Sequence, residues 1–391
     1  MMNSSHKKPV LTPAEAFSRY GEELCQHDNR GGGLVIFPGV IGTVFFERGS
    51  KPDVRRGLLA CFDRFEQLFG PYLKGGRNGD DGRFSRKTPR GVEAIRRAIL
   101  EVPPEVKLEV VRSSAIDEDS AAAYQIETLT DVAVAEDYTD PSGFFVKKGQ
   151  DCGLSYLKFW MPMDFVNTPE GVRSYEAFLR FVCEQLPVRG GYGGFSSILP
   201  YSFHEYMPQE WALAQRFSGL EIDSYAFLQK QEYDTMSYEG QSTDHMTAIY
   251  EDLRPGAKVG HYGFIKGVNW YTLIGDLLVD RLGGESAVRA DLARPDIGIE
   301  RIGHCLLIRA GDFPRLGAPE EGLPKPYVFV NRVLRVLRNP VPPSLHTNVP
   351  GAEHADPDGT RRWEARFDLP GAPLLPRTPE IVPAKKNDPA N

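Results

Sequence analysis

Gly42–Phe69 has the sequence GTVFFERGSKPDVRRGLLACFDRFEQLF and contains an apolar run, a turn and a second apolar pattern. The first run is typical of a buried strand, and the apolar residues after the turn recur at three- and four-residue steps, which predicts an amphipathic helix. Pro52 is expected in the first helical turn, where a missing N–H costs nothing. Ser50 and Asp53 are expected to form a capping box there. A strand followed by a helix that buries one face is therefore the basic unit of the predicted fold.

A second stretch, Phe159–Leu186, has the sequence FWMPMDFVNTPEGVRSYEAFLRFVCEQL and repeats this pattern. When Pro169 is aligned with Pro52, the offset is 117 residues (169 − 52), and a second capping box is predicted from Asn167 and Glu170. The apolar stripes correspond in these aligned pairs: Leu58 and Tyr175, Cys61 and Phe178, Phe62 and Leu179, Phe65 and Val182, Phe69 and Leu186. Two such units cannot cover their own apolar faces, so the economical packing is two pseudo-symmetric strand-helix halves that share sheets and core. The alternative is a chance similarity between two strand-helix pairs of similar length.

The sequence as a whole predicts an α+β fold with mixed or antiparallel sheets and packed helices. Further expected elements are strands at 106–112 and 124–135, helices at 89–101 and from Asn269 or Trp270 to Gly283, a hairpin at 299–302 and 305–309, and a strand or helix at 327–337. We expect an N-terminal extension at 1–30, one α+β domain at 31–340 and a Pro-rich C-terminal tail at 341–391. Because prolines recur along this tail, it is expected to be largely irregular.

Composition excludes several classes of protein. The 391 residues carry a net charge of −7, which argues against a nucleic-acid binder and favours a basic partner. No apolar run approaches the roughly 18 residues of a membrane span, so no membrane association is expected. The N-terminus lacks the apolar segment and cleavage site of a secretory signal, which predicts a cytoplasmic protein. The five cysteines are widely spread without a CxxC pair and are interpreted as reduced thiols rather than zinc ligands.

Tests for catalytic motifs are negative, and no catalytic, cofactor-binding or metal-binding residue is predicted. His204 and Glu205 begin a pattern like HExxH, but Pro208 stands where the second histidine would share the metal. The glycine-rich run 189–194 lacks the spacing of a P-loop or a dinucleotide fingerprint and is interpreted as a flexible turn. A hydrolase with a dispersed site would have to use Ser196, Ser197, Asp244, His245, His261 or His304, of which Asp244 and His245 are the best pair.

Two kinds of residue are candidates for contact with a macromolecular partner. Acidic clusters can steer a basic partner, although solvated turns explain the same residues. Tyrosines after the second helix can anchor an interface, although aromatic residues also build cores. The candidate partner-binding residues are Asp80, Asp81, Asp117, Glu118, Asp119, Tyr192, Tyr201 and Tyr206.

Three motifs together resemble a known family. They are Thr43–Phe46 with the helix start SKPD from Ser50, the stretch GVNWYTLIGDLLVDRLGG at Gly267–Gly284, and Arg309–Gly317 at the end of the expected hairpin. Over residues 30–340, the chain is similar to the type VI secretion immunity family named TsiV, for immunity against VRR-Nuc nuclease effectors.

The resemblance implies an α+β fold and a cytoplasmic inhibitor that binds a cognate toxic effector, a DNase, and keeps DNA from its active site. An acidic inhibitor fits such a partner, because a nuclease carries a basic groove for DNA. Two other function classes stay open. One is an enzyme, either a hydrolase with a dispersed active site or one that inactivates the product of a toxin. The other is a structural component of the secretion apparatus, which the lack of a coiled coil or assembly repeat disfavours.

Overall fold

The computed structural model describes residues 10–28, 33–79, 82–139, 145–151, 153–226, 264–339, 342–347 and 349–369. Within these residues, nine α-helices accompany one 11-stranded sheet, in which neighbouring strands are antiparallel. A separate two-stranded sheet pairs β7 (Tyr138–Thr139) with β8 (Phe145–Val146). The predicted α+β class is confirmed.

The strands of the two similar stretches are neighbours at the centre of the large sheet. They are β2 (Leu34–Phe46) and β9 (Ser155–Pro162). On the β2 side follow β10 (Val188–Ile198), β11 (Tyr271–Gly275), β13 (Cys305–Ala310) and β12 (Ile297–Ile302). On the β9 side follow β6 (Gln125–Thr130), β5 (Leu108–Ser113), β3 (Gly75–Asn78) and β4 (Ser85–Arg86), while β1 (Gln26–His27) pairs with the start of β2.

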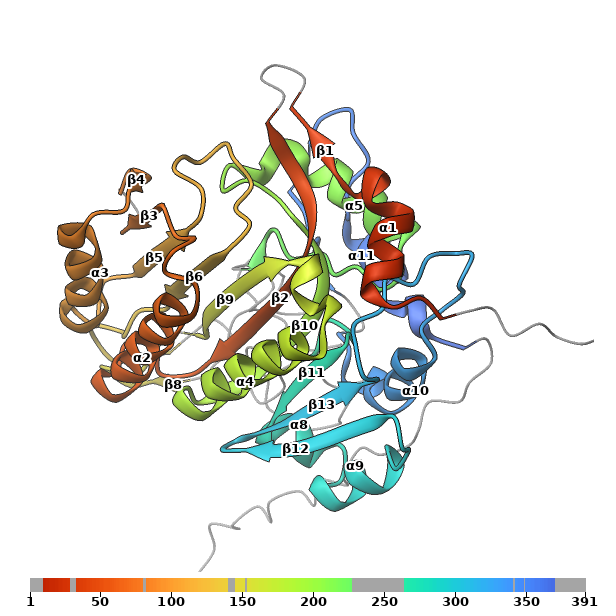
Figure 1. The fold of residues 1–391 in the computed structure, drawn as a ribbon. Helices are drawn as coiled ribbons and strands as arrows, with labels where there is room; N and C mark the ends of the chain where they lie inside the picture. Colours follow the sequence, from red (N-terminus) through yellow and green to blue (C-terminus); the bar gives the residue numbers. More distant parts are fainter. Residues whose placement is uncertain are drawn as a thin grey trace, which may run out of the picture.

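Helices α2 (Pro52–Phe69) and α4 (Pro169–Gln185) lie next to each other in front of the central strands (Figure 1). The predicted apolar stripes of both helices are buried. Phe178 of α4 makes an edge-to-face contact with Phe159 of β9, with 4.7 Å between the ring centroids. Helix α3 (Pro89–Glu101) packs against α2. Both predicted strand-helix units are thus confirmed, and burial of the helical stripes against the sheet holds them in place.

The two predicted capping boxes are wrong. The N-cap of α2 is Lys51, because the backbone N–H and hydroxyl of Ser50 are instead donated to Asp151. The N-cap of α4 is Thr168 rather than Asn167, and the Thr168 hydroxyl accepts a backbone N–H of the first turn at 3.1 Å. Each helix therefore begins one residue later than the spacing alone indicates.

The helix predicted at 269–283 is wrong over its first half. Tyr271–Gly275 form the strand β11, and the helix α8 (Asp276–Arg281) follows it. Leu273 and Ile274 are adjacent in the strand and both are buried. A strand covered on both faces has a continuous apolar run, which periodicity cannot distinguish from a buried helix.

The flexible turn predicted at 189–194 is also wrong, because these residues lie within β10 and pair with β2. Glycine is required there by close neighbours. A Cβ atom at Gly193 would lie 2.1 Å from the hydroxyl of Tyr175, and one at Gly194 would lie 2.0 Å from the side-chain oxygen of Asn269. The glycines let a second layer of side chains approach the backbone closely.

The C-terminal segment that was expected to be irregular contains the helix α11 (Pro357–Glu364), which begins at the N-cap Asp356. Trp363 of α11 belongs to a buried apolar cluster with Trp211 of α5 (Met207–Arg216). A proline in the first helical turn is compatible with such a helix, so the proline content did not exclude it. Where this segment should be divided from the preceding domain stays a prediction.

Other predicted elements are confirmed. The hairpin at 299–302 and 305–309 corresponds to β12 and β13, and the helix at 89–101 is α3. The open choice at 327–337 is decided by the helix α10 (Lys325–Leu334). The remaining helices are α1 (Pro13–Leu24) and α9 (Glu285–Asp291). Among the helices in the described ranges, none combines the length and hydropathy that crossing a bilayer requires.

Candidate functional site

A row of polar side chains crosses the middle of the large sheet. Strand register places Glu127 of β6, Lys158 of β9, Thr43 of β2 and Tyr192 of β10 directly beside one another. Side chains alternate between the faces of a strand, so Phe159 points toward α4 while its neighbour Lys158 points to the opposite face. Polar groups in the interior of a sheet cost free energy unless they find partners.

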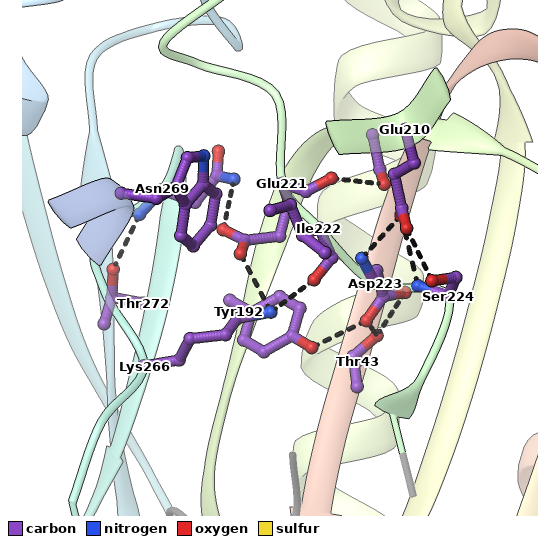
Figure 2. Close-up of polar contacts among 12 residues, drawn as sticks. Thr43, Tyr192, Glu210, Glu221, Ile222, Asp223, Ser224, Lys266, Asn269 and Thr272 are labelled. Carbon is purple, nitrogen blue, oxygen red and sulfur yellow. Dashed lines mark hydrogen bonds and ion pairs between the residues drawn. The ribbon is translucent and has the colours of Figure 1, made fainter. Parts of the chain in front are cut away.

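The segment 221–224 lies over this row and supplies the partners (Figure 2). Asp223 is buried and accepts hydrogen bonds from the hydroxyl of Tyr192 at 2.6 Å and from the hydroxyl of Thr43 at 3.1 Å. Lys158 donates to the backbone carbonyl of Asp223 at 2.8 Å and forms an ion pair with its carboxylate at 3.0 Å. The negative charge of Asp223 is thus balanced and fully hydrogen-bonded, which is what a buried carboxylate requires.

A second buried ion pair lies beside the first. Lys266 contacts Glu221 at 2.9 Å, and the exposed fractions of the two side chains are 0% and 1%. Lys266 also donates to the carbonyl of Ile222 at 2.6 Å, and its ammonium lies 3.9 Å from the centre of the Tyr192 ring, a cation–π contact. The amide of Asn269 donates to the other carboxylate oxygen of Glu221 at 2.9 Å (Figure 2). We refer to the segment 221–224 and the side chains that hold it on the sheet, namely Thr43, Lys158, Tyr192, Lys266 and Asn269, as the frame.

Glu210 of α5 connects this frame to the C-terminal segment. Its carboxylate accepts the backbone N–H of Asp223 at 2.9 Å and lies 2.9 Å from Nε2 of His346. Because Nδ1 of His346 accepts the N–H of Ala355 at 3.3 Å, the ring proton lies on Nε2 and is donated to Glu210. Burial alone would raise the pKa of Glu210, but hydrogen bonds from His346 and Ser224 outweigh it and hold this pKa below its usual value.

A cavity of about 430 Å³ opens beside the frame. Glu127, Lys158, Trp160 and Asp223 line its floor, whereas residues of the loop after β10 reach the exposed rim. The volume lies within the range of about 300–1,000 Å³ that is typical of sites for small ligands.

Electrostatics distinguish Glu127 from the other groups on the cavity floor. Burial raises the pKa of Glu127 by more than Lys158 and Gln125 lower it. For Lys158 the balance is opposite, because attraction to Asp223 and Glu127 outweighs burial and raises its pKa. A carboxyl group with a raised pKa inside a cavity is a common mark of a functional site.

Comparison with protein families decides which family this fold and site belong to. Residues 57–238 and 252–367 match the family TsiV, described as type VI immunity for VRR-NUC. The chain belongs to the TsiV family. The resemblance to this family is therefore confirmed, although the match begins at residue 57 rather than 30, after the first of the three motifs, and extends beyond residue 340 into the C-terminal segment.

A solved structure shares the fold of this TsiV-family chain. The Pseudomonas aeruginosa T6SS protein PA0821 aligns with a TM-score of 0.70 and 22% identity, over 91% of this chain and 92% of that chain. A search of curated proteins found no match to the sequence.

The structure places several predicted partner-binding residues of this TsiV-family chain at the cavity rim. Glu118 and Tyr201 both line the cavity, and the backbone carbonyl of Glu118 accepts the N–H of Ser202 at 2.9 Å. Asp117 and Asp119 flank Glu118 in the same turn and are exposed. We refer to Asp117–Asp119 as the acidic turn. The acidic turn and the loop after β10, which carries Tyr201, come from distant parts of the sequence and meet here.

The other predicted residues that the structure describes do not line the cavity, although Tyr206 interacts with Asp119 of the acidic turn. Burial, together with a hydrogen bond to Glu205, raises the pKa of Tyr206 to about 12, and the negative charges of Glu205, Asp28 and Asp119 add to this effect. Tyr192 is only 1% exposed and lies within the frame, so it offers no direct contact to a partner. Asp80 and Asp81 lie outside the described residues.

Residues proposed for a dispersed hydrolase site do not converge in the part of the TsiV-family chain that the structure describes. Ser196 is buried and donates to the carbonyl of Glu221 at 2.8 Å, whereas His304 is exposed and lies 3.0 Å from Asp276. Within the same described ranges, no group of three or more His, Cys, Asp or Glu side chains is arranged to hold a metal ion. Ser197 follows Ser196 and also lines the cavity, whereas Asp244, His245 and His261 lie outside the described residues.

Sequence reasoning missed most of the frame of the TsiV-family site, together with Glu127 on the cavity floor and the pair Glu210 and His346 that links the frame to the C-terminal segment. The missed residues are Thr43, Glu127, Lys158, Glu210, Glu221, Asp223, Lys266 and His346. One signal was available, because Lys158 stands between Leu157 and Phe159 in a strand that is otherwise apolar on both sides of it. A single charge within such a strand indicates a buried and paired group.

Proposed function

We propose that this TsiV-family chain neutralises its cognate VRR-NUC effector by stoichiometric binding, without catalysis, and covers the surface on which the nuclease holds DNA. The contact surface is the binding rim, which we define as the acidic turn together with Tyr201 and Tyr206. The observation that most supports this proposal is that Glu118, which is flanked by two exposed aspartates, and Tyr201 line one cavity. Tyr206 adjoins the acidic turn through its interaction with Asp119.

Physical chemistry favours this rim as an inhibitor surface. A nuclease must present a basic groove to DNA, so carboxylates on the inhibitor speed up encounter and match the charge in the complex. Tyrosines supply apolar area and a hydroxyl at little cost in side-chain entropy, which suits them as anchors. The frame beneath the rim is held by buried ion pairs, so binding requires little ordering. We expect this encounter to take place in the cytoplasm.

Calorimetric titration of the purified full chain with the cognate effector tests the rim. A variant with Asp117→Lys, Glu118→Lys and Asp119→Lys is expected to bind at least about 100-fold more weakly, because it replaces attraction with repulsion. The matched control is Asp280→Lys, which reverses an exposed charge on α8 and is expected to change the affinity by no more than about twofold. Equal affinity of the triple variant and the wild type would show that the rim is not the contact surface.

Inhibition of DNA cleavage tests the stoichiometric mechanism separately. If the chain acts by binding, residual nuclease activity falls linearly as the chain is added and reaches zero at one chain per effector. Complete protection far below this ratio would instead support the hydrolase-like alternative, in which one chain inactivates many molecules. Protection without any complex between wild-type chain and effector would rule out the proposed mechanism.

A further inference from the structure

We propose that the cavity behind the binding rim is a receptor site for one arginine side chain of the effector, and that Glu127 is the carboxylate that meets the guanidinium. This inference rests on the proposed function and names the chemistry by which the same site would recognise its partner. Insertion of an arginine from the DNA groove would also remove a phosphate-binding group from the nuclease.

The charges that line the cavity leave an excess of carboxylate. Glu109, Glu118, Glu127 and Asp223 contribute negative charges, whereas Lys107 and Lys158 contribute the positive ones. Lys158 is already paired with Asp223 at 3.0 Å, Glu109 is paired with Arg77 at 3.9 Å, and Lys107 is exposed at the rim. Glu118 and Glu127 are the carboxylates that remain in excess among the lining residues. The cavity is therefore complementary to a cation rather than to an anion.

The aromatic walls of the cavity suit a planar cation. Trp160, Tyr156, Tyr201 and Phe203 line it. Two of these rings already form cation–π contacts. The ammonium of Lys158 lies 5.0 Å from the centre of the Trp160 ring, and the guanidinium of Arg77 lies 5.2 Å from the centre of the Tyr201 ring. Arginine combines stacking on aromatic faces with bidentate hydrogen bonding to carboxylates, whereas lysine offers only a point charge.

Its position on the cavity floor makes Glu127 the carboxylate that would bind the guanidinium. It stands next to Lys158 in the sheet register, and one of its carboxylate oxygens accepts the Gln125 amide at 2.6 Å. Burial keeps its pKa above the usual value, so Lys158 and Gln125 compensate its charged form only in part in the free chain. A guanidinium that enters the cavity supplies this compensation and favours the carboxylate.

Calorimetric titration with the cognate effector tests the inference through two variants of the full chain. Glu127→Gln keeps the shape of the side chain and is expected to weaken binding about 10- to 100-fold, because the guanidinium then enters a site without its carboxylate. The control Glu184→Gln removes an exposed charge from α4, on the helix-covered side of the sheet, and is expected to leave the affinity within about twofold. Thermal unfolding of both variants verifies that they fold. Equal binding by Glu127→Gln and the wild type would overturn the inference, whereas the proposed function would stand.

A small-molecule probe separates failure of the inference from failure of the proposed function. Arginine amide is added to the free chain, and the indole N–H signal of Trp160 is followed by NMR; citrulline amide has nearly the same shape but no charge. The expected result is a saturable shift with arginine amide, a weaker one with lysine amide, and none with citrulline amide or in Glu127→Gln. Equal shifts with arginine amide and citrulline amide would overturn the inference, whether or not the effector binds.

Discussion

Gly42 on β2 lies directly opposite Phe159 on β9, and the Phe159 ring occupies the space that a side chain at position 42 would need. These are also the two residues that the 117-residue offset equates (159 − 42). Antiparallel strands that pair at equivalent residues are the arrangement that a local twofold axis between them produces. This supports the proposal that the two strand-helix units are related halves, with α2 and α4 side by side over the strands.

Gly42→Ala is expected to lower the free energy of unfolding by about 1–3 kcal/mol, because the new Cβ would lie 2.3 Å from Cζ of the buried Phe159 ring. Gly33→Ala is the control, since no atom lies within 4 Å of the place that its new methyl group would take and the residue is exposed. Urea denaturation measures both variants. A neutral Gly42→Ala would show that the central strands separate more easily than their packing indicates.

His346→Ala is expected to destabilise the chain by about 2–4 kcal/mol, because it leaves the buried carboxylate of Glu210 without its ring donor. The control is His354→Ala, whose ring lies 3.3 Å from the nearby carbonyl of Ala352. Thermal unfolding followed by circular dichroism compares them. Similar melting temperatures for the two variants would mean that the contact to Glu210 contributes little.

The raised pKa of Glu127 leads to a specific prediction for how the free energy of unfolding depends on pH. Its folded-state pKa is raised above the ordinary value of 4.5, so between these two values the unfolded chain loses a proton that the folded chain keeps. The contribution of Glu127 to the free energy of unfolding is therefore full below pH 4.5 and falls as the pH rises toward the raised pKa. Glu127→Gln removes this contribution.

The difference in unfolding free energy between wild type and Glu127→Gln should consequently fall with rising pH across that window and then level off. Urea denaturation at a series of pH values measures it. A difference that stays constant with pH would show that Glu127 has an ordinary pKa in the folded chain. The advantage of the wild type over Glu127→Gln is thus expected to be no larger at neutral pH than at acidic pH.

Tyr175 and Gly193 are expected to be coupled. The hydroxyl of Tyr175 donates to the carbonyl of Ile41 at 2.6 Å and fills the space beside Gly193. Gly193→Ala should destabilise the wild type by about 2 kcal/mol, and by about 1 kcal/mol less in a Tyr175→Phe background, where the hydroxyl is gone. A double-mutant cycle of unfolding free energies measures the coupling, and strictly additive effects would contradict it.

The sequence sufficed for elements that have one buried face. The stripes of α2 and α4 have clear helical periodicity, and both helices were located to within a few residues. It did not suffice for β11, which is buried on both faces, or for the glycines of β10, whose purpose depends on Tyr175 and Asn269. Local patterns carry no information about such distant neighbours.

The site followed the same rule. The acidic turn and Tyr201 could be proposed as contact residues because clustered charges and aromatic residues are visible in the sequence itself, and their role stays a prediction. The frame was not, since Lys158, Asp223 and His346 acquire their roles only when segments far apart in the chain meet. A charged residue in an apolar stretch indicates that a partner exists, but not which one.

The link from His346 through Glu210 to Asp223 has a consequence for the order in which the site forms during synthesis. A nascent polypeptide lacks His346 until nearly all of the described residues have been made. Thr43, Lys158 and Tyr192 can hold Asp223 before then, whereas the support that Glu210 receives from His346 is added last.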